Sequence, residues 1–529
     1  MQRLTRFRRR LAGESGFAMP AVMIGMFLAG LFSLAALGGV VGDIPIARSD
    51  QDHKRAHEAA EAGLAWYQFQ LGADPTYWTK CTDVPQPAPG VTAPVNQVWN
   101  GAGTDPRVWR NLPGGSEAQY TIELLPATGQ TACDPTKPQT TLLQNNTLRI
   151  RSTGRVRGRK RSIVATFKRK SFLDYVYFTN LETLDPATYS DAGMRAWAQG
   201  TDTTQGQCEK YWRDGRGNSS YNGARCTEIQ FMSGDAINGP FHTNDSILTS
   251  GSPVFGRTGD KVEMTGGAPT GWRSNGGGGT PVFKGPKTVP AASLDLPPDN
   301  GALKTLADPA YKFTGKTTLV FQGDKVLVTN AAVGTNIPLA LPPPNGIIYV
   351  SNGACGKSYT PAQNYTDIPD GCGNAWVKGT YSKAVTVAAE NDVIINDDLT
   401  HTGDGLLGLI ANQYIRVYHP VTDPTAANPA NASDTLGDVT IDAAILSLKH
   451  SFIVDNYSKG GASGNLNVFG AIAQNFRGPV GSTDTYGLHG YIKNYTYDDR
   501  LAYEEPPNFL DPVQTAWRMV RATEQQPAR

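Results

Sequence analysis

The longest apolar stretch of the chain runs from Phe17 to Gly42 and contains no charged residue. An α-helix over this stretch, rising about 1.5 Å per residue, is long enough to cross the roughly 30 Å hydrocarbon core of a membrane. Arginines crowd residues 3–10, and basic residues stay on the cytoplasmic side. We therefore predict a single-pass transmembrane helix over residues 17–42, with the rest of the chain extracytoplasmic. A conventional signal peptide would instead have a shorter apolar core followed by a small-x-small cleavage site.

The pattern changes to an amphipathic one over residues 43–71. Small and apolar residues recur at i, i+3 and i+4 spacing, which places them on one face of a helix, and the opposite face is charged. The members of that face are Ala56, Ala59, Ala60, Gly63, Leu64 and Tyr67. Pro45 lies near the junction and can kink the helix or start a new one. We predict a second helix over residues 43–71 that packs on a globular domain.

Beyond this helix the apolar period becomes two, which is typical of strands. Alternating runs cover residues 119–125, 147–152 and 162–167. They predict a small antiparallel sheet within residues 72–172 that receives the amphipathic helix. Residues 173–300 read as a β region that ends in a Gly/Pro-rich linker.

A weak internal repeat begins further on. Residues 385–395 resemble residues 407–417 at an offset of 22, and residues 445–454 and 469–476 repeat the theme. Each copy is a strand, a polar corner and another strand, which predicts a parallel β-helix (solenoid) over residues 301–480, with residues 481–529 as a C-terminal cap. The predicted inward-facing residues are Val387, Val393, Ile395, Leu409, Ile415, Val417, Ile453 and Val454. A β-sandwich with irregular hairpins is the alternative.

Composition supports a mainly β fold with one long N-terminal α-helix. The 529 residues include 58 Gly and 36 Pro, which favour many turns and short strands. The length indicates several domains. A formal net charge of +1 points to no class of partner.

The six cysteines fall into three pairs that are local in sequence: Cys81 with Cys133, Cys208 with Cys226, and Cys355 with Cys372. No CxxC sequence occurs, and no Cys/His cluster has the spacing of a zinc site. An even count suits disulfides in an oxidising compartment. Six reduced, buried cysteines are the alternative.

Two groups of polar residues are candidates for catalysis or ligand binding. Asp397 and Asp398, with His401 and Asp404 close by, could serve a polysaccharide-cleaving enzyme or hold calcium, although Asn-Asp-Asp is also ordinary turn sequence, and we favour the turn. A basic hairpin could bind DNA or an anionic polymer, but its charges partly alternate with apolar residues, and we favour a solvated face. Its members are Arg149, Arg151, Arg155, Arg157, Arg159, Lys160, Arg161, Lys168, Arg169 and Lys170.

No other sequence signals an enzyme. The chain contains no GxSxG, P-loop or HExxH sequence. We expect no catalytic residue, no metal and no cofactor.

Two short segments resemble a known family. Glu14-Ser15-Gly16-Phe17, placed between a basic leader and an apolar helix, resembles the class III leader of type IV prepilins. The segment Ala59-Ala60-Glu61-Ala62-Gly63 is similar to one in X-type minor pilins and pilus-assembly proteins. The resemblance implies that prepilin peptidase removes residues 1–16 by cutting between Gly16 and Phe17, and that the new Phe17 amine is methylated. It also implies that the apolar helix lies in a pilus core after assembly.

One departure from the family pattern narrows this interpretation. Major pilins carry Glu at the fifth position of the mature chain, where this sequence has Ala21. The resemblance therefore implies a minor, tip or priming subunit.

Together these features predict a non-enzymatic, pilin-like assembly protein that displays an extracellular β domain for assembly or adhesion. The implied partners are prepilin peptidase, other pilin or pilus-assembly subunits and the membrane, with a surface glycan or DNA as a further ligand. Two alternatives stay open, namely a membrane-anchored β-helix enzyme acting on polysaccharide and a surface module that binds glycan or DNA.

The mature protein is expected to begin at Phe17 with a methylated amine, because Gly16-Phe17 is followed at once by the uncharged helix. Mass spectrometry of the N-terminal peptide from the native host measures this. A chain that still begins at Met1, or one cut beyond Gly42, would contradict the prediction.

Overall fold

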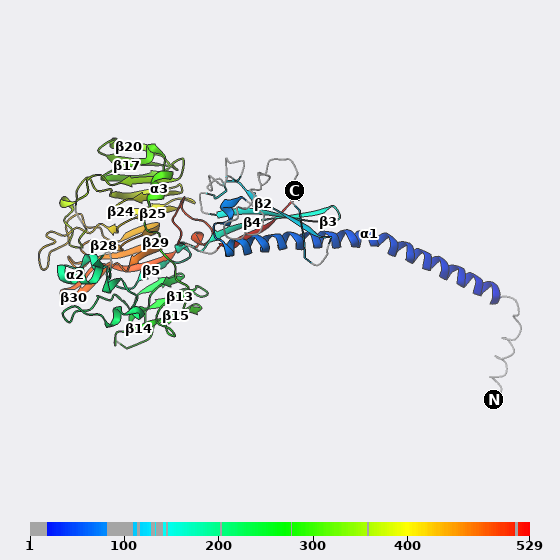
Figure 1. Cartoon of the computed structure of the whole chain (residues 1–529), viewed down its shortest axis with the longest axis horizontal. Coiled ribbons are helices and arrows are strands. Elements are labelled where there is room, and N and C mark those ends of the chain that lie inside the picture. The colour runs from blue at the N-terminus through cyan, green and yellow to red at the C-terminus, as the bar shows by residue number, and fades with distance from the viewer. Residues whose placement is uncertain are drawn as a thin grey trace, which may run out of the picture.

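The protein is an elongated molecule in which a long helix leads to a small sheet and then to a large β domain (Figure 1). This computed structural model is mainly β with one long N-terminal helix, as the sequence predicted. The structure describes residues 18–81, 109–113, 117–127, 133, 141–143, 147–201, 204–276, 278–356, 359–513 and 517–528.

The two predicted helices form one continuous helix, α1 (Ala18–Ala73). The break considered at Pro45 does not occur. A proline removes one backbone donor, and a long helix can accommodate that loss without ending. The prediction of a transmembrane helix over residues 17–42 finds no support by length and hydropathy, since no helix in the described part of the chain meets the requirements of a membrane span.

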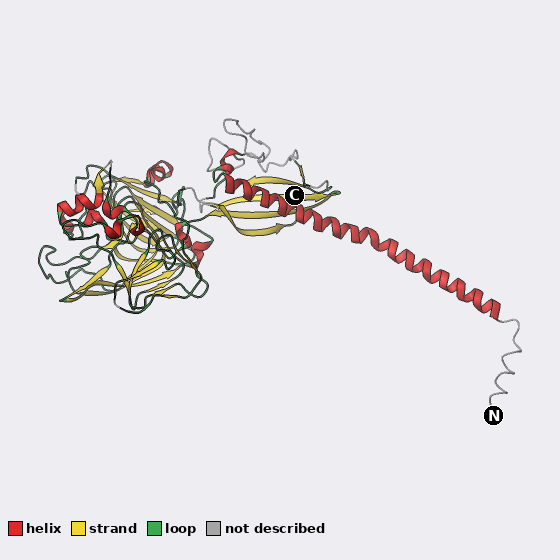
Figure 2. Cartoon of the chain, turned by 60° about the horizontal axis from the view of Figure 1, so that its bottom comes forward, coloured by secondary structure: helices red, strands yellow, loops and turns green. Residues whose placement is uncertain are grey.

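The C-terminal half of α1 packs along a five-stranded antiparallel sheet (Figure 2). The three predicted runs correspond to its central strands. In spatial order the strands are β1 (Arg110–Asn111), β2 (Gln119–Leu125), β3 (Thr147–Val156), β4 (Arg159–Arg169) and β32 (Trp517–Gln525). Between β3 and β4, Arg157 and Gly158 both have positive φ, as a tight two-residue hairpin turn requires.

The strand β32 corrects the prediction that residues 481–529 cap the solenoid. Its residues pair with β4, from Trp517 opposite Arg169 to Gln525 opposite Ser162. The outer edge of β4 offers unpaired backbone donors and acceptors, and β32 satisfies them. The chain therefore returns from the large domain to the small sheet on which α1 packs.

The predicted helix face is the buried one. Ala56, Ala59 and Ala60 are fully buried, and Leu64 and Tyr67 pack in the same core as residues of the sheet. The helix comes very close to β3 at Gly154, where a Cβ would lie only 2.6 Å from the Ala60 amide nitrogen. Small residues on both surfaces therefore permit the close contact.

The large domain consists mostly of parallel strands stacked on one another. β23 (Val385–Ala389) pairs with β25 (Leu407–Ala411), and Val385 lies opposite Leu407. β25 pairs in turn with β27 (Val439–Ser447), and β27 with β29 (Ala462–Phe476). The described pairs among strands between Val385 and Phe476 are parallel, in contrast to the antiparallel hairpins of the sandwich alternative.

The other strands with parallel partners lie either in this ladder or in further parallel ladders of the same domain. They include β5 (Tyr177–Leu181), β9 (Ala236–Asn238), β10 (Phe241–Thr243), β12 (Val254–Phe255), β13 (Val262–Met264), β15 (Val282–Phe283), β16 (Lys287–Thr288), β17 (Lys312–Thr314), β21 (Ile347–Ser351), β22 (Ala375–Tyr381), β24 (Val393–His401), β26 (Ile415–Val417), β28 (Phe452–Val454) and β31 (Gly487–Tyr497).

All the residues predicted to face inward are buried, which confirms that part of the pattern. Val387, Val393, Ile395, Leu409, Ile415, Val417, Ile453 and Val454 have no measurable exposure. Most of them belong to one continuous apolar core that runs through the stack.

Residues 173–300 are not a separate region with a linker, as predicted, but continue the same stack. β5 pairs with β29 on one side and β10 on the other, so the chain enters the stack in its middle. The segment beyond β16 then lies along the stack. There the buried Asn300 donates its backbone N–H to the Asn412 side-chain oxygen and its side-chain amide to the Ala389 carbonyl. These hydrogen bonds fix a segment whose composition predicted a linker.

Short elements complete the large domain. At one end, β18 (Thr317–Gly323), β19 (Lys325–Asn330) and β20 (Gly334–Ala340) form an antiparallel meander, and α3 (Gly301–Leu306) contacts β21. A side sheet contains β8 (Gln230–Met232), β11 (Ile247–Ser250) and β14 (Trp272–Ser274). The remaining elements are α2 (Ala192–Gln199), β6 (Gly200–Thr201), β7 (Thr204–Gln205) and β30 (Gly481–Asp484).

Replacing Gly154 with alanine is expected to lower the free energy of unfolding by about 1–3 kcal/mol, because the added methyl group collides with the helix backbone at Ala60. Urea denaturation measures the change. Gly72→Ala is the matched control, since nothing lies within 4 Å of a Cβ there and alanine favours helix. Equal stability of the Gly154→Ala protein and the wild type would contradict the close packing.

Candidate functional site

The predicted processing site, Gly16 and Phe17, lies outside the described residues. The three disulfides of the structure join Cys81 to Cys133, Cys208 to Cys226 and Cys355 to Cys372. These are the pairs that sequence proximity predicted. Two of them shape the candidate site described below.

The candidate side chains at residues 397–404 do not come together in one site. Asp397 lies 3.5 Å from the Lys378 ammonium, and Asp398 accepts the Thr440 backbone N–H at 2.8 Å. His401 pairs instead with Asp442, at 2.8 Å. Among the described residues no group of three or more His, Cys, Asp or Glu side chains is placed to hold a metal ion. The favoured interpretation, an ordinary turn, is wrong, because Asp397 and Asp398 lie within β24, at a point where its pairing with β22 shifts register.

The basic hairpin is largely neutralised by carboxylates. Arg157 pairs with Glu117 at 2.6 Å, and Arg161 pairs with Glu524 of β32 at 2.9 Å. The other pairs are Arg151–Glu123, Lys168–Glu505, Arg169–Asp511 and Lys170–Glu263. Several of these partners are far away in sequence, so local patterns could not reveal them. The pairing leaves much less free positive charge than the sequence suggested.

A polar cavity of about 770 Å³ opens on one corner of the parallel stack. Its floor comes from the turns after successive strands, which supply Asn391 and Gln413. Arg195 and Gln199 of α2 form one wall, and Tyr359 forms another. Three segments that are remote in sequence therefore meet at this cavity.

Disulfides hold both walls of the cavity. Cys355–Cys372 closes the loop that carries Tyr359. On the other side, Ala198 of α2 packs in a small core with Cys208 and Cys226. The walls are thus fixed by covalent bonds that an oxidising compartment would preserve.

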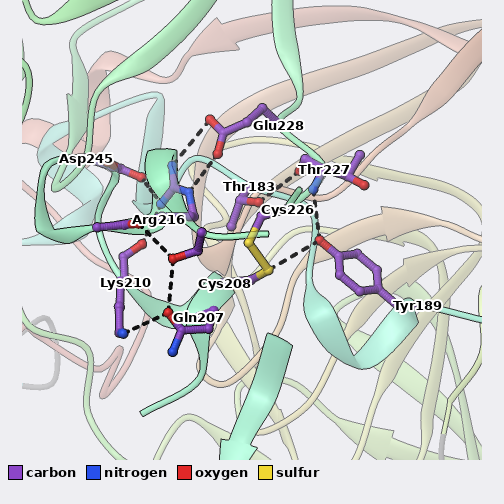
Figure 3. Close-up of a disulfide and its surroundings, with 12 residues drawn as sticks. Thr183, Tyr189, Gln207, Cys208, Lys210, Arg216, Cys226, Thr227, Glu228 and Asp245 are labelled. Carbon is purple, nitrogen blue, oxygen red and sulfur yellow. Dashed lines mark hydrogen bonds and ion pairs between the residues drawn. A yellow bond between two sulfur atoms is a disulfide. The ribbon is translucent and has the colours of Figure 1, made fainter. Parts of the chain in front are cut away.

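The second disulfide is surrounded by polar contacts that fix its loop (Figure 3). The Tyr189 hydroxyl lies 3.8 Å from the Cys208 sulfur and accepts the Thr227 N–H at 3.0 Å. In the same loop the buried Arg216 pairs with Glu228 at 2.7 Å and with Asp245 at 2.6 Å. This loop supports α2 and thereby the position of Arg195 and Gln199.

Four planar groups form a column beside the cavity. The Arg416 guanidinium lies 4.5 Å from the centre of the Tyr359 ring, and the Tyr359 ring lies 4.4 Å from that of Tyr414. The Tyr414 and His450 rings stack almost parallel at 4.3 Å. Such stacking adds to the energy of burial and holds each ring in one orientation. The column ends at His450, whose side chain is 21% exposed.

Buried ion pairs support the inner end of the column. Arg416 bonds to Asp392 at 3.0 Å and to both oxygens of Asp455, at 3.0 and 2.9 Å. The hydroxyl groups of Tyr359 and Tyr365 also donate to Asp455. Burial raises the pKa of the Asp392 carboxyl, and the Arg416 charge opposes that rise. Burial likewise raises the pKa of the Tyr359 hydroxyl, so it remains a donor at neutral pH.

Asp185 holds the outer end of the column. One of its carboxylate oxygens lies 2.7 Å from His450 Nδ1 and accepts the Tyr414 hydroxyl at 2.7 Å. The other oxygen accepts the Ala187 N–H at 2.9 Å. One carboxylate oxygen therefore orients the two rings, and the other fixes the turn that carries Asp185.

Sequence reasoning did not find this site. Asp185 and His450 are 265 residues apart, and no short sequence joins them. The one available signal was the polar corner after each repeated strand, which contains Asn391 and Gln413.

Replacing Arg416 with methionine is expected to lower the free energy of unfolding by about 3–5 kcal/mol at pH 7, because Asp392 and Asp455 would stay buried without a cation. Burial already raises the pKa of Asp392, and without the guanidinium that pKa would rise further, so the folded protein would bind more protons than the unfolded chain. The loss should therefore shrink as the pH falls from 7 to 5 in urea denaturation. Arg213→Met, at an exposed position, is the control, and a deficit independent of pH would contradict the prediction.

No protein-family model and no curated protein matches the chain. Among solved structures, the chain is similar to that of the competence-associated pilin ComZ from Thermus thermophilus. The two share 12% sequence identity over 90% of this chain and 98% of that chain, with a TM-score of 0.22. A score this low carries no argument about fold or function.

Proposed function

We propose that the chain is a non-enzymatic, pilus-associated surface protein that is anchored through the N-terminal half of α1 and displays the large β domain outside the cell. The observation that carries the proposal is the division of α1 into two chemically different halves. One half packs on the small sheet of its own chain, and the other half has no such partner among the described residues.

The unpartnered half exposes a dense set of large apolar side chains. Between residues 19 and 34 these side chains are 48–76% exposed. They are Met19, Val22, Met23, Ile24, Met26, Phe27, Leu28, Leu31, Phe32 and Leu34. So much apolar surface is costly in water, which favours burial in lipid and then among the apolar helices of other pilus subunits. Prepilin peptidase would act just before this segment, between Gly16 and Phe17.

The junction between the small sheet and the large domain suits a display function. Lys168 of β4 lies 3.0 Å from Glu505 and donates to the Leu501 carbonyl at 2.7 Å. Arg169 pairs with Asp511 at 3.1 Å, and Arg518 of β32 pairs with Asp174. Burial and the nearby Glu505 raise the pKa of the Asp511 carboxyl, and the Arg169 charge opposes that rise. These ion pairs, of which Lys168–Glu505 is almost fully buried, would hold the large domain in one orientation at the end of the helix.

The large domain itself supports a role in contact. We infer that its parallel ladders form a β-solenoid, because each strand buries its apolar side chains against the next rung. Three disulfides suit an extracellular setting. A stiff stack of this kind offers a broad surface, which favours adhesion or assembly over turnover.

Replacing Phe27 with lysine is expected to remove most of the protein from the membrane and from sheared surface fibres. A charge at the centre of an apolar helix costs about 2.5–3.5 kcal/mol on insertion. Phe69→Lys is the matched control, since Phe69 is 71% exposed on the half of α1 that packs on the sheet. Immunoblots of cell fractions and sheared fibres measure the distribution.

The proposal would fail if wild-type protein were absent from both fractions, or if Phe27→Lys protein were distributed like the wild type. Formation of the three disulfides in both variants, checked by non-reducing electrophoresis, separates a loss of anchoring from a loss of folding.

A further inference from the structure

Polar side chains recur at one corner of six successive rungs of the parallel stack. The rungs are β21, β23, β25, β27, β29 and β5, each paired with the next. Val350, Ala389, Ala411 and Ser447 pair with one another across successive strands. The residues two positions later in the sequence are all polar: Asn352, Asn391, Gln413 and Lys449. In β29 and β5 the polar residue follows the paired position by one residue instead of two. These residues, Asn475 and Asn180, continue the row and share a hydrogen bond of 2.8 Å.

Two cavities lie along this row. The cavity of about 770 Å³ contacts Asn352, Asn391 and Gln413, and a second cavity of about 390 Å³ contacts Lys449, Asn475 and Asn180. His450 borders the first and its neighbour Lys449 the second. With neighbouring strands about 4.8 Å apart, the five intervals between the six rungs span about 24 Å. The corner therefore presents polar groups at a regular spacing over the length of a short chain-like ligand.

Neutral groups provide the free hydrogen-bonding capacity of the larger cavity. The side-chain amides of Gln199 and Gln413 line it and make no hydrogen bond to another described residue. Asn391 uses one N–H toward Asn374, and Asn352 uses its carbonyl oxygen toward Gly373. Each amide can donate and accept, which matches a hydroxyl group that does the same.

The charged groups of this cavity are mostly occupied. Asp392 is paired with Arg416, and His450 with Asp185. Arg195 donates to the Tyr189 carbonyl and is the one cation of the lining without a carboxylate partner among the described residues. A polyanion such as a nucleic acid requires several free cations, and among the described residues that line the two cavities only Arg195 and Lys449 are cations without a carboxylate partner.

An aromatic surface completes the chemistry. The His450 ring ends the column of planar groups, with one face on Tyr414 and its side chain partly exposed at the cavity. The carbon–hydrogen face of a sugar ring can pack on such a surface while its hydroxyl groups bond to the amides around it.

We propose that this corner, from Asn352 to Asn180, is a binding groove for a neutral oligosaccharide that lies along the ladder. The inference deepens the proposed display function by naming the ligand class of the displayed domain. It concerns binding by the purified protein, so it can fail or succeed independently of membrane anchoring.

The test uses the full chain in detergent on an array of neutral and acidic oligosaccharides of two to eight residues, followed by calorimetric titration of the strongest binder. A neutral oligosaccharide is expected to bind, and affinity is expected to rise with chain length up to several residues. Gln199→Ala/Gln413→Ala is expected to weaken binding at least 10-fold, because both amides line the cavity and neither supports the fold. Gln322→Ala is the matched control, an exposed amide on β18 that should bind as the wild type does.

Three results would overturn the groove: no oligosaccharide binds, only acidic oligosaccharides bind, or the double variant binds like the wild type. Thermal unfolding of each variant verifies that the fold is intact. Mass spectrometry of the incubated oligosaccharide adds an independent readout, because cleavage products would overturn the non-enzymatic part of the proposed function while leaving binding in place.

Discussion

The structure depends on the register of its parallel strands. Parallel pairing gathers the apolar side chains of most strands of the large domain into one continuous core, which a single pair of strands could not form alone. The pairing of Val385 with Leu407, and of Leu409 with Ile445, aligns buried residues from rung to rung. The same register also aligns the polar residues that follow each strand. The apolar core and the row of amides at the corner are two consequences of one constraint.

Close contact between α1 and the small sheet connects this stack to the N-terminal half of the helix. Gly154 and the small residues Ala56 and Ala60 allow the helix backbone to approach β3. β32 then ties the end of the chain to the same sheet. The helix, the sheet and the ion pairs of Lys168 and Arg169 form one continuous connection between the large domain and the N-terminal half of α1. A load or a contact on the large domain would be passed to the helix along it.

Sequence patterns predicted the parts of this fold that depend on nearby residues. The buried face of α1 followed from the spacing of Ala56, Ala60 and Leu64, and the inward side chains of the ladder followed from the offset of 22 residues. The disulfide pairs were near neighbours in sequence. The predicted break at Pro45 was wrong, because a long helix can accommodate one missing backbone donor.

The parts that could not be predicted bring together distant segments. Nothing near Trp517 indicates that it will pair with Arg169, and nothing near Tyr177 indicates that it will lie beside Ile472. The candidate site has the same character, since Asp185 and His450 meet only after the whole stack has formed. The charges of the basic hairpin likewise appear unpaired in the sequence, because a partner such as Glu524 lies near the far end of the chain.

Chemical labelling on intact cells tests the central claim, that the two halves of α1 occupy different environments. Phe27→Cys and Phe69→Cys proteins would each be treated with a membrane-impermeant maleimide before and after solubilisation in detergent. Both side chains are exposed in the isolated chain, at 69% and 71%. The Phe69→Cys protein is expected to be labelled on intact cells, whereas the Phe27→Cys protein is expected to be labelled only after solubilisation. Equal labelling of both positions on intact cells would contradict the central claim.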